Sequence, residues 1–433
     1  MSRRVGVWIA GAYGNVGTFV VAGAAALRRG LTSTVGLVTE TRELRDLDFV
    51  PVCDLVFGGH EIREGSLVAT AEEFGERNGL LGPALRQAIE DDLRGADADV
   101  RPGVLLDAPA EVRAMASPDG LAVRSPSEMI ARVQADLRAF RDRHGLDTVI
   151  VVNLISTEAA PGDCPALRSE ETFRAALAAP PEANGGPLDG VPSSVLYAYA
   201  AVDAGFPFVD FTPAVAVGTA PVRAAALRMA VPCMGRDGKT GETLVKTVLA
   251  PMFVARHLRV LSWEGTNMLG NRDGAVLRGD AARASKVRDK DEALRRILGD
   301  ADAHSSVRID YVPSLGDWKQ AYDFIHFEGF LGARMQMHFL WQGCDSALAA
   351  PLVLDLVRLT DLAHRRGEAG PLPQLACFFK SPLGGAGQAF PVQMALLVRW
   401  AEAFRDGPPA PARAPRRADT PPADAPRPSR TAR

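Results

Sequence analysis

The chain has 433 residues, of which 47% are hydrophobic and 23% are charged, the balance of a soluble globular protein. This length exceeds one ordinary hydrophobic core, so we expect two domains with additions. The formal net charge of -3 gives no reason to expect binding to nucleic acid or to a membrane surface.

The five cysteines are scattered and include no CxxC pair. This spacing predicts a reducing compartment, with neither a disulfide framework nor a metal site. The start of the chain runs directly into a predicted strand, which leaves no room for a signal peptide. The longest apolar run, residues 18–27, is too short to span a bilayer. We therefore expect a cytoplasmic protein.

The first half of the chain alternates runs of β-branched residues with helical stretches. Strands are predicted at residues 5–10, 33–39, 55–57, 147–153 and 206–211, and helices at 19–29, 127–144 and 193–204. This alternation is typical of a parallel, doubly wound sheet. We predict an α/β fold with a Rossmann-like domain over residues 1–235.

The pattern changes from about residue 258, where strands follow one another with little helix between them. They are predicted at 259–263, 306–312 and 323–340. Polar and apolar residues alternate from Arg334 to Phe339, which predicts one buried and one solvated face. We expect an inserted α+β domain with a largely antiparallel sheet over residues 236–342, used for catalysis and oligomerisation.

Helical sequence returns at residues 347–365 and 391–405. We expect this C-terminal part, residues 343–406, to pack back on the first domain. Residues 407–433 are rich in proline, alanine and arginine, which cannot build a core. They predict a disordered tail.

Three glycines stand between the first predicted strand and the first helix. Gly11 permits a tight turn, Gly14 lets the backbone approach a pyrophosphate, and Gly17 permits close packing of strand and helix. The pyrophosphate would lie on the N-terminus of the helix. The usual spacing is GxGxxG, or has a glycine in place of Tyr13. A glycine-rich turn without a cofactor therefore stays open as an alternative.

A dinucleotide site also needs an acidic residue for the adenosine ribose. Glu40 ends the predicted second strand, and Glu61 is its competitor. A second turn, Gly238-Lys239-Thr240, precedes a predicted helix at residues 242–255. It is not a P-loop, because no glycine stands five residues before it.

Four lysines, Lys286, Lys290, Lys319 and Lys380, lie in short polar stretches of the second half. A single lysine is usually a solvated surface residue. Lys286 and Lys290 are spaced i to i+4, so on a helix they repel unless an anion lies between them. Lys380 follows two phenylalanines and precedes Pro382, where an ammonium needs a partner. Burial near other cations lowers the pKa of a lysine, so we expect Lys380 to exchange protons near neutral pH.

Side-chain amides and carboxylates accompany these lysines, at Asn267, Asn271, Asp273 and Asp317. With the dinucleotide site they predict hydride transfer on an anionic, oxygen-rich substrate, because enolate and phosphate oxygens need fixed positive charge. The histidines His60, His326 and His338 have no ligand spacing with one another or with a cysteine, which favours structural roles.

Ordered matches run from residue 5 to about residue 399. They lie at 11–17, 58–62, 151–158, 192–200, 237–246, 269–274, 285–287, 311–319, 349–352 and 378–382. Through them the chain resembles the myo-inositol-1-phosphate synthase (inositol-3-phosphate synthase) family, of the prokaryotic type.

The resemblance implies an NAD-dependent isomerising cyclase with no net redox change. It implies that glucose 6-phosphate is oxidised at C5, enolised, closed by an intramolecular aldol reaction and reduced to myo-inositol 1-phosphate (inositol 3-phosphate). It further implies NAD as the cofactor, a hexose 6-phosphate as the substrate, and a homotetramer or dimer.

The resemblance also implies roles for single residues. Lys380 would transfer the proton of the C5 hydroxyl, Lys286 and Lys319 would stabilise oxyanions, and Lys290 would bind phosphate. The other implied catalytic positions, which orient lysines or bind substrate, are Asp273, Asp317, Asn267 and Asn271. The implied cofactor-binding positions are Gly11, Tyr13, Gly14, Asn15, Val16, Gly17, Glu61, Ser156, Thr157, Asp237, Thr240, Gly241 and Asp345.

Arg236, Arg272 and Trp318 stand where the family usually has small or acidic residues. Bulky side chains beside the substrate would change which sugar phosphate fits. The alternative is therefore a related cyclase that acts on another hexose phosphate, such as fructose 6-phosphate, and gives a different carbocyclic cyclitol phosphate. An NAD dehydrogenase that releases a ketone and a non-catalytic NAD-binding homologue are further alternatives.

Overall fold

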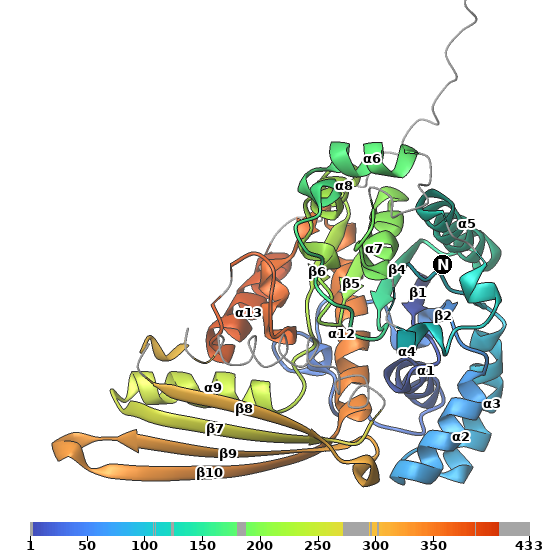
Figure 1. The fold of residues 1–433 in the computed structure, drawn as a ribbon. Coiled ribbons are helices and arrows are strands. Elements are labelled where there is room, and N and C mark those ends of the chain that lie inside the picture. Colours follow the sequence, from blue (N-terminus) through green and yellow to red (C-terminus); the bar gives the residue numbers. More distant parts are fainter. Residues whose placement is uncertain are drawn as a thin grey trace, which may run out of the picture.

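The computed structural model describes residues 3–106, 108, 110–122, 125–179, 188–271, 294, 297–300, 303–385 and 387–406. The predicted tail, residues 407–433, lies outside them. The described chain forms a larger sheet surrounded by helices and a smaller sheet that projects from it (Figure 1).

The larger sheet has seven strands in the order β11-β6-β5-β4-β1-β2-β3, and every neighbouring pair is parallel. The strands are β1 (Val5–Ala10), β2 (Leu55–Glu61), β3 (Val100–Pro102), β4 (Thr148–Asn153), β5 (Phe208–Asp210), β6 (Pro232–Gly235) and β11 (Gly370–Pro371). The order β3-β2-β1-β4-β5-β6 is that of a doubly wound dinucleotide-binding sheet. The predicted α/β, Rossmann-like fold is confirmed.

Helices cover both faces of this sheet, so its central strand β1 is buried throughout. Val7 and Ile9 join a core with α1, α3 and α12, whereas Trp8 and Ala10 join a core with α5, α7 and α8. The helices are α1 (Asn15–Arg28), α2 (Leu67–Asn78), α3 (Pro83–Asp97), α4 (Ala110–Arg113), α5 (Pro126–His144), α6 (Glu170–Ala178), α7 (Ser193–Asp203), α8 (Ala220–Met229), α9 (Glu242–Ala255), α12 (Asp345–Arg365) and α13 (Phe390–Asp406).

The smaller sheet has the order β10-β9-β7-β8. Its strands are β7 (Arg259–Leu269), β8 (His304–Tyr311), β9 (Trp318–Glu328) and β10 (Arg334–Cys344). The pairs β10·β9 and β9·β7 are antiparallel, and β7·β8 is parallel. Helix α9 covers one face, where Phe253 packs against Trp263 and Phe327. The largely antiparallel character predicted for this sheet is therefore observed.

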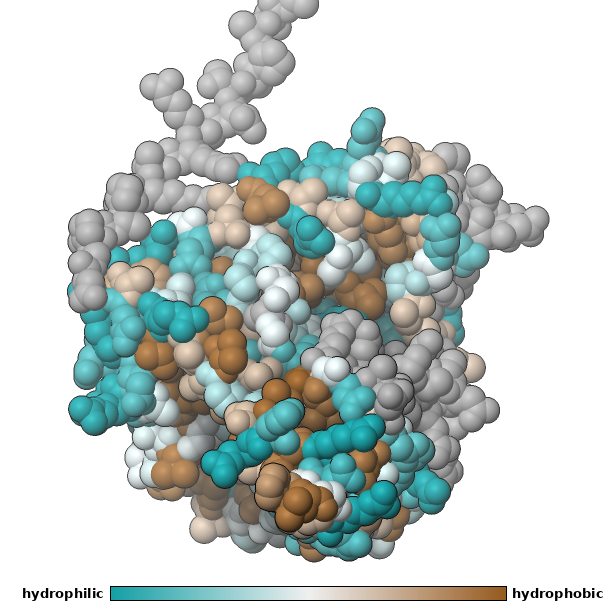
Figure 2. Space-filling view, turned by 90° about the vertical axis from the view of Figure 1, so that its left-hand side faces the viewer, coloured by the Kyte–Doolittle hydropathy of each residue, from teal (hydrophilic) through white to brown (hydrophobic). Residues whose placement is uncertain are grey.

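Residues 323–340, predicted as strand, belong to two strands that meet in a tight hairpin. The N–H of Gly329 donates to the Ala333 carbonyl at 2.9 Å, and Phe330 and Leu331 at the tip are each 88% exposed. Figure 2 faces this end of the sheet and shows apolar side chains among hydrophilic ones at the bottom of the molecule. Met337 and Phe339 of β10 are only half-buried, because β10 is an edge strand.

The strand predicted at residues 33–39 is wrong. This segment is a surface turn followed by a short 3-10 helix, Val38–Glu40. The backbone N–H groups of Val38 and Thr39 donate to the Asp355 carboxylate of α12, at 2.7 and 3.0 Å. A buried side chain from a distant helix thus takes the hydrogen bonds that a neighbouring strand would need.

The segment between β2 and residue 106 adds α2, α3 and β3, which the sequence patterns did not predict. No described helix is long and apolar enough to cross a membrane.

Candidate active site

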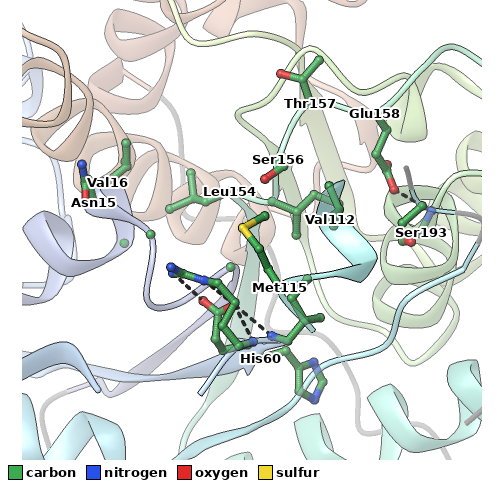
Figure 3. A pocket seen from close by; sticks show the side chains of 18 of the residues that line it. Asn15, Val16, His60, Val112, Met115, Leu154, Ser156, Thr157, Glu158 and Ser193 are labelled. Carbon is green, nitrogen blue, oxygen red and sulfur yellow. Dashed lines mark hydrogen bonds and ion pairs between the residues drawn. The ribbon is translucent and has the colours of Figure 1, made fainter. Parts of the chain in front are cut away.

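A cavity of about 530 Å³ lies at the carboxyl ends of β1, β2 and β4. The strand order reverses between β1 and β4, and ligands of open α/β sheets bind at such a point. Figure 3 shows Asn15 and Val16 on one side of the cavity, Glu158 and Ser193 on the other, and Met115 between them. Its volume falls in the range of a cofactor site.

The glycine turn forms one wall of this cavity. Gly11 has φ +85°, and a Cβ there would lie 2.8 Å from the Leu154 carbonyl oxygen. A Cβ on Gly17 would lie 2.7 Å from the Ala12 carbonyl oxygen. Gly14 is the N-cap of α1 and supplies no side-chain hydrogen bond, so the first N–H groups of the helix stay available for an anion. The turn therefore fits the pyrophosphate of a dinucleotide.

Glu61, at the end of β2, lines the cavity beside this turn. Its Oε2 accepts the backbone N–H of Tyr13 at 2.8 Å, and its Oε1 accepts the N–H of Ile62 at 2.9 Å. Glu40 lies elsewhere and accepts a hydrogen bond from Arg358 of α12 at 2.6 Å. Of the two candidates for the ribose, only Glu61 lines the cavity, because the second strand of the sheet is β2 and not residues 33–39.

A second cavity of about 130 Å³ adjoins the first and shares Val16, Thr157 and Asp345 with it. Its polar walls come from segments far apart in the sequence. They include Asp237, Thr240, Asn267, Lys319 and Lys380. A small molecule held here would lie directly beside the inner end of the dinucleotide cavity.

Lys380 forms an ion pair with Asp237, with Nζ 2.7 Å from Oδ1. Two loops hold this pair, because the Lys380 N–H donates to the Asp237 carbonyl at 2.7 Å and the Lys239 N–H to the Phe378 carbonyl at 2.8 Å. Burial alone would lower the pKa of Lys380, but the carboxylates of Asp237, Asp345 and Glu242 outweigh it and raise the pKa. The expectation of a lowered pKa for Lys380 is wrong, since its partner was not foreseen.

Among the lysines that the structure describes, Lys239 has a lowered pKa. Burial, helped by the nearby Lys380 ammonium, lowers the pKa of Lys239 to about 8. Its Nζ lies 2.5 Å from the Oε1 of Gln393 on α13 and near the ring of Phe390. Lys239 thus anchors α13 to the loop that carries Asp237.

Because of Lys239, we expect the free energy of unfolding to rise with pH between about 8 and 10.5. The lower limit is the pKa of Lys239 in the folded chain, and the upper limit is its ordinary pKa. In that window the unfolded chain binds more protons than the folded chain, so the free energy of unfolding increases with pH. Lys239→Met keeps the apolar stem and removes the titration. Urea unfolding at several pH values should give a shallower rise for the variant; equal slopes in the two proteins would contradict this account.

Asp317, directly before β9, joins the smaller sheet to the first turns of α1 and α12. Its Oδ2 accepts the N–H of Ser346 in the first turn of α12 at 2.7 Å, and its Oδ1 accepts from Asn15 Nδ2 at 3.3 Å. Burial raises the pKa of Asp317. Asp345 begins α12 and accepts from the Thr240 hydroxyl at 3.1 Å. These contacts fix the N-terminus of α12 between the two cavities.

Trp318 lines neither cavity. Its indole N–H donates to the carbonyl of Asn78, at the end of α2, at 3.0 Å. Arg236 lines neither cavity, but its guanidinium donates at 2.6 Å to the carbonyl of Pro213, which lines the second cavity. The expectation that Trp318 lies beside the substrate is wrong, and for Arg236 it stays a prediction. Arg272 lies outside the described residues.

Lys246 lies buried beneath the second cavity. Its Nζ is 2.6 Å from Glu242 Oε1 and 3.2 Å from Asp323 Oδ1, and Asp323 also accepts the Trp263 indole N–H at 2.7 Å. Gly265 leaves room for this group, since a Cβ there would lie 2.8 Å from Lys246 Nζ. Burial raises the pKa of Asp323. The network joins α9 to the smaller sheet below Asn267.

Lysine is scarce in this chain, which has 49 lysines and arginines together but only six lysines. All six lie between residues 239 and 380, and the four described ones are those just placed in or beside the second cavity. Arginine thus supplies most of the positive charge elsewhere. Lysine carries a compact charge that can titrate when buried. This scarcity is a signal in the sequence that would have pointed to Lys239 and Lys246 as well.

The predicted residues fall into four groups. Those lining the first cavity are Gly11, Gly14, Asn15, Val16, Gly17, Glu61, Ser156, Thr157, Asn271, Asp317 and Asp345. Those that line only the second cavity are Asn267, Lys319, Lys380, Asp237 and Thr240, whereas Val16, Thr157, Asn271 and Asp345 line both. Tyr13 and Gly241 line neither; Tyr13 bonds to Glu61, and Gly241 is the N-cap of α9. Asp273, Lys286 and Lys290 lie outside the described residues.

Several residues that line the first cavity were not predicted. They are His60, Arg63, Val104, Leu105, Val112, Met115 and Glu158. Val104, Leu105, Val112 and Met115 come from the segment that follows β3, where the sequence patterns predicted no element. Their apolar members form a wall suited to an adenine ring.

This fold and site define an enzyme of the Rossmann-like, NAD-binding class. A family model described as myo-inositol-1-phosphate synthase matches residues 5–401. The chain belongs to that family, whose members are NAD-dependent isomerases.

Known relatives agree with this assignment. The chain is 32% identical to inositol-3-phosphate synthase 1 of Bacteroides thetaiotaomicron, over 88% of this chain and 90% of the relative. It is 28% identical to the inositol-3-phosphate synthase of Trypanosoma brucei brucei, over 84% and 73%. The fold is similar to a crystal structure of the Caenorhabditis elegans inositol-3-phosphate synthase, with a TM-score of 0.80 and 22% identity over 93% and 86%.

Proposed function

We propose that this enzyme converts glucose 6-phosphate to myo-inositol 1-phosphate (inositol 3-phosphate), with NAD as cofactor and no net redox change. The observation that carries the proposal is the Lys380–Asp237 ion pair in a cavity that opens onto the dinucleotide cavity. A sugar held there would have a proton-transferring group and the nicotinamide on neighbouring sides.

Bound NAD supplies the oxidising power for the first step and the reducing power for the last. The chain would hold it by the N–H groups of the first turn of α1 and by the turn that Gly11 and Gly17 permit. Ser156 and Thr157 follow β4 and line the cavity on its way to Lys380, so we assign them to the nicotinamide half. Asp237, Thr240 and Asp345 would complete this end.

Lys380 and Asp237 would together move the proton of the C5 hydroxyl. Because Asp237 keeps Lys380 protonated, Nζ can accept the hydroxyl proton only as it passes one of its own to Asp237 Oδ1, 2.7 Å away. The same ammonium would then return the proton to the oxygen at C5 during the final reduction. A positioned pair of this kind contributes roughly 10² to 10⁴ in rate.

Ring closure needs fixed positive charge near the oxygens of C5 and C1, because loss of a C6 proton puts the enolate charge on the C5 oxygen and the aldol attack leaves an alkoxide at C1. We assign Lys319 to these oxygens, since it lines the same cavity as Lys380. Asn267 and Asn271 would bind sugar hydroxyls. Lys286 would share the oxyanions and Lys290 would bind the phosphate, as the resemblance implies, and Asp273 would orient these lysines.

We further propose that the enzyme assembles as a homotetramer or dimer through the smaller sheet. Helix α9 covers one face of this sheet, and the other face leaves Tyr322 43% and Leu340 68% exposed. Apolar side chains on an uncovered sheet face favour contact with a second copy. Light scattering would give the mass; a monomer at micromolar concentration would refute the assembly.

Product identification tests the proposed substrate. The enzyme with NAD is incubated separately with glucose 6-phosphate and with fructose 6-phosphate, and the products are identified by NMR. We expect a six-carbon ring phosphate from glucose 6-phosphate. The part of the ketose argument that rests on Trp318 no longer holds, because Trp318 lines neither cavity. Turnover of the ketose alone would refute the proposed substrate.

A further inference from the structure

Arg63 is a cation at the point where a dinucleotide-binding sheet usually meets the adenosine ribose, two residues after the end of β2. It lines the first cavity, and its side chain is 21% exposed. Among the described residues that line this cavity it is the single lysine or arginine. Nothing in the reaction proposed above uses it.

The carboxylate of Glu61 is already occupied beneath Arg63. Its Oε1 accepts the N–H groups of Ile62 at 2.9 Å and Arg63 at 3.2 Å, and its Oε2 accepts the N–H of Tyr13 at 2.8 Å. The Arg63 guanidinium adds contacts at 3.3 and 3.4 Å. A carboxylate offers about four lone-pair sites. Glu61 therefore serves mainly to tie the glycine turn to β2.

This arrangement removes the usual barrier to a phosphate on the ribose. An acidic side chain at the end of the second strand normally accepts the ribose 2′-hydroxyl and repels a 2′-phosphate. Here the charge of Glu61 is neutralised by Arg63, through Nε and Nη2. A guanidinium has five N–H donors in a planar fork, so others remain to bind an anion.

The backbone around Arg63 is held in place. The Ile62 carbonyl accepts the Ser117 N–H at 2.7 Å, and the Glu61 carbonyl accepts the Gly103 N–H at 2.8 Å. Arg63 thus extends from a segment fixed on both sides. An arginine that binds phosphate through two N–H groups needs a backbone held in place in this way.

The other titratable groups along this cavity do not offset the positive charge of Arg63 at the ribose end. Burial lowers the pKa of His60, whose Nδ1 accepts the Trp8 indole N–H at 3.2 Å and whose Nε2 lies 3.0 Å from the Asp136 carboxylate. Glu158 accepts the backbone N–H groups of Ser193 and Ser194 on the far side (Figure 3). Asp317 and Asp345 lie at the N-terminus of α12, toward the second cavity.

We propose that Arg63 forms a subsite for a 2′-phosphate on the adenosine ribose, so that the enzyme binds NADP as well as NAD. The inference rests on the dinucleotide site proposed above and is independent of the sugar. A charge-assisted hydrogen bond to the phosphate corresponds to roughly 10- to 100-fold in Kd.

The test measures Kd for NADH and NADPH by the fluorescence of the reduced nicotinamide, on the full chain and two variants. Arg63→Gln removes the charge and keeps hydrogen-bonding groups. Arg101→Gln is the matched control, since Arg101 follows the first residue of β3, donates to the Ala98 carbonyl and does not line the cavity.

We expect the ratio of Kd for NADPH to Kd for NADH to increase at least about tenfold in Arg63→Gln and to stay unchanged in Arg101→Gln. A smaller increase in Arg63→Gln, or an equal one in the control, would overturn the subsite. Adenosine 2′,5′-bisphosphate and AMP, used as competitors, should show the same preference. If neither reduced nucleotide binds to the unaltered enzyme, the dinucleotide site itself is wrong.

Discussion

Replacing Lys380 with alanine is expected to lower kcat by roughly 10³-fold, because the variant loses both a proton-transferring group and a fixed positive charge. Lys380 lies 2.7 Å from Asp237 and lines the second cavity, not the first. NAD binding should therefore change by less than about threefold. Steady-state kinetics and a fluorescence titration with NADH separate the two effects. Near-normal turnover would refute the assigned role.

Lys380→Arg distinguishes proton transfer from charge alone. Arginine keeps a positive charge near Asp237 but does not give up its proton at ordinary pH. If Lys380 moves a proton, the arginine variant should be as impaired as the alanine variant. If recovery is substantial, Lys380 acts by its charge, and the proposed passage of a proton to Asp237 is wrong.

Gly17→Ala is expected to raise the Kd for NAD at least about tenfold, since a crowded methyl group costs roughly 1–3 kcal/mol. The added Cβ would lie 2.7 Å from the Ala12 carbonyl oxygen, so the turn must move away from α1. That movement would displace the N–H groups proposed to hold the pyrophosphate. Calorimetric titration with NAD measures the change.

The same helix offers a matched control for this variant. Gly23 also lies in α1, and nothing comes within 4 Å of a Cβ built there. Gly23→Ala should leave the Kd for NAD unchanged and stabilise the helix by about 0.5–1 kcal/mol. Equal Kd values for the two variants would show that the close approach at Gly17 does not shape the cofactor site.

The parts of the fold that were predictable are those governed by local sequence. The strand at residues 5–10, the glycine turn after it and the helix at residues 242–255 follow from patterns within a few residues. The strand predicted at 33–39 failed because its partner, Asp355, lies more than three hundred positions away. Polar patterns within the segment carry no information about that partner.

The candidate site shows the same limit. The sequence shows that Lys380 lies in an apolar segment, but it does not show whether the pKa of Lys380 is raised or lowered. Asp237, which reverses the effect of burial, stands 143 positions earlier in the chain. Trp318 was recognised as bulky, but its direction is set by a hydrogen bond to Asn78, 240 positions away. Residue type was thus readable, whereas orientation depended on contacts distant in sequence.

The most direct test of the central claim uses glucose 6-phosphate that carries deuterium at C5, with NAD at about one tenth of the substrate concentration. If oxidation and reduction occur at the same carbon in one site, NAD is regenerated and roughly ten turnovers per NAD are possible. We predict complete conversion, with the deuterium retained in the cyclic phosphate and no NADH accumulating at 340 nm. Conversion that stops when one equivalent of NADH has formed would contradict the account.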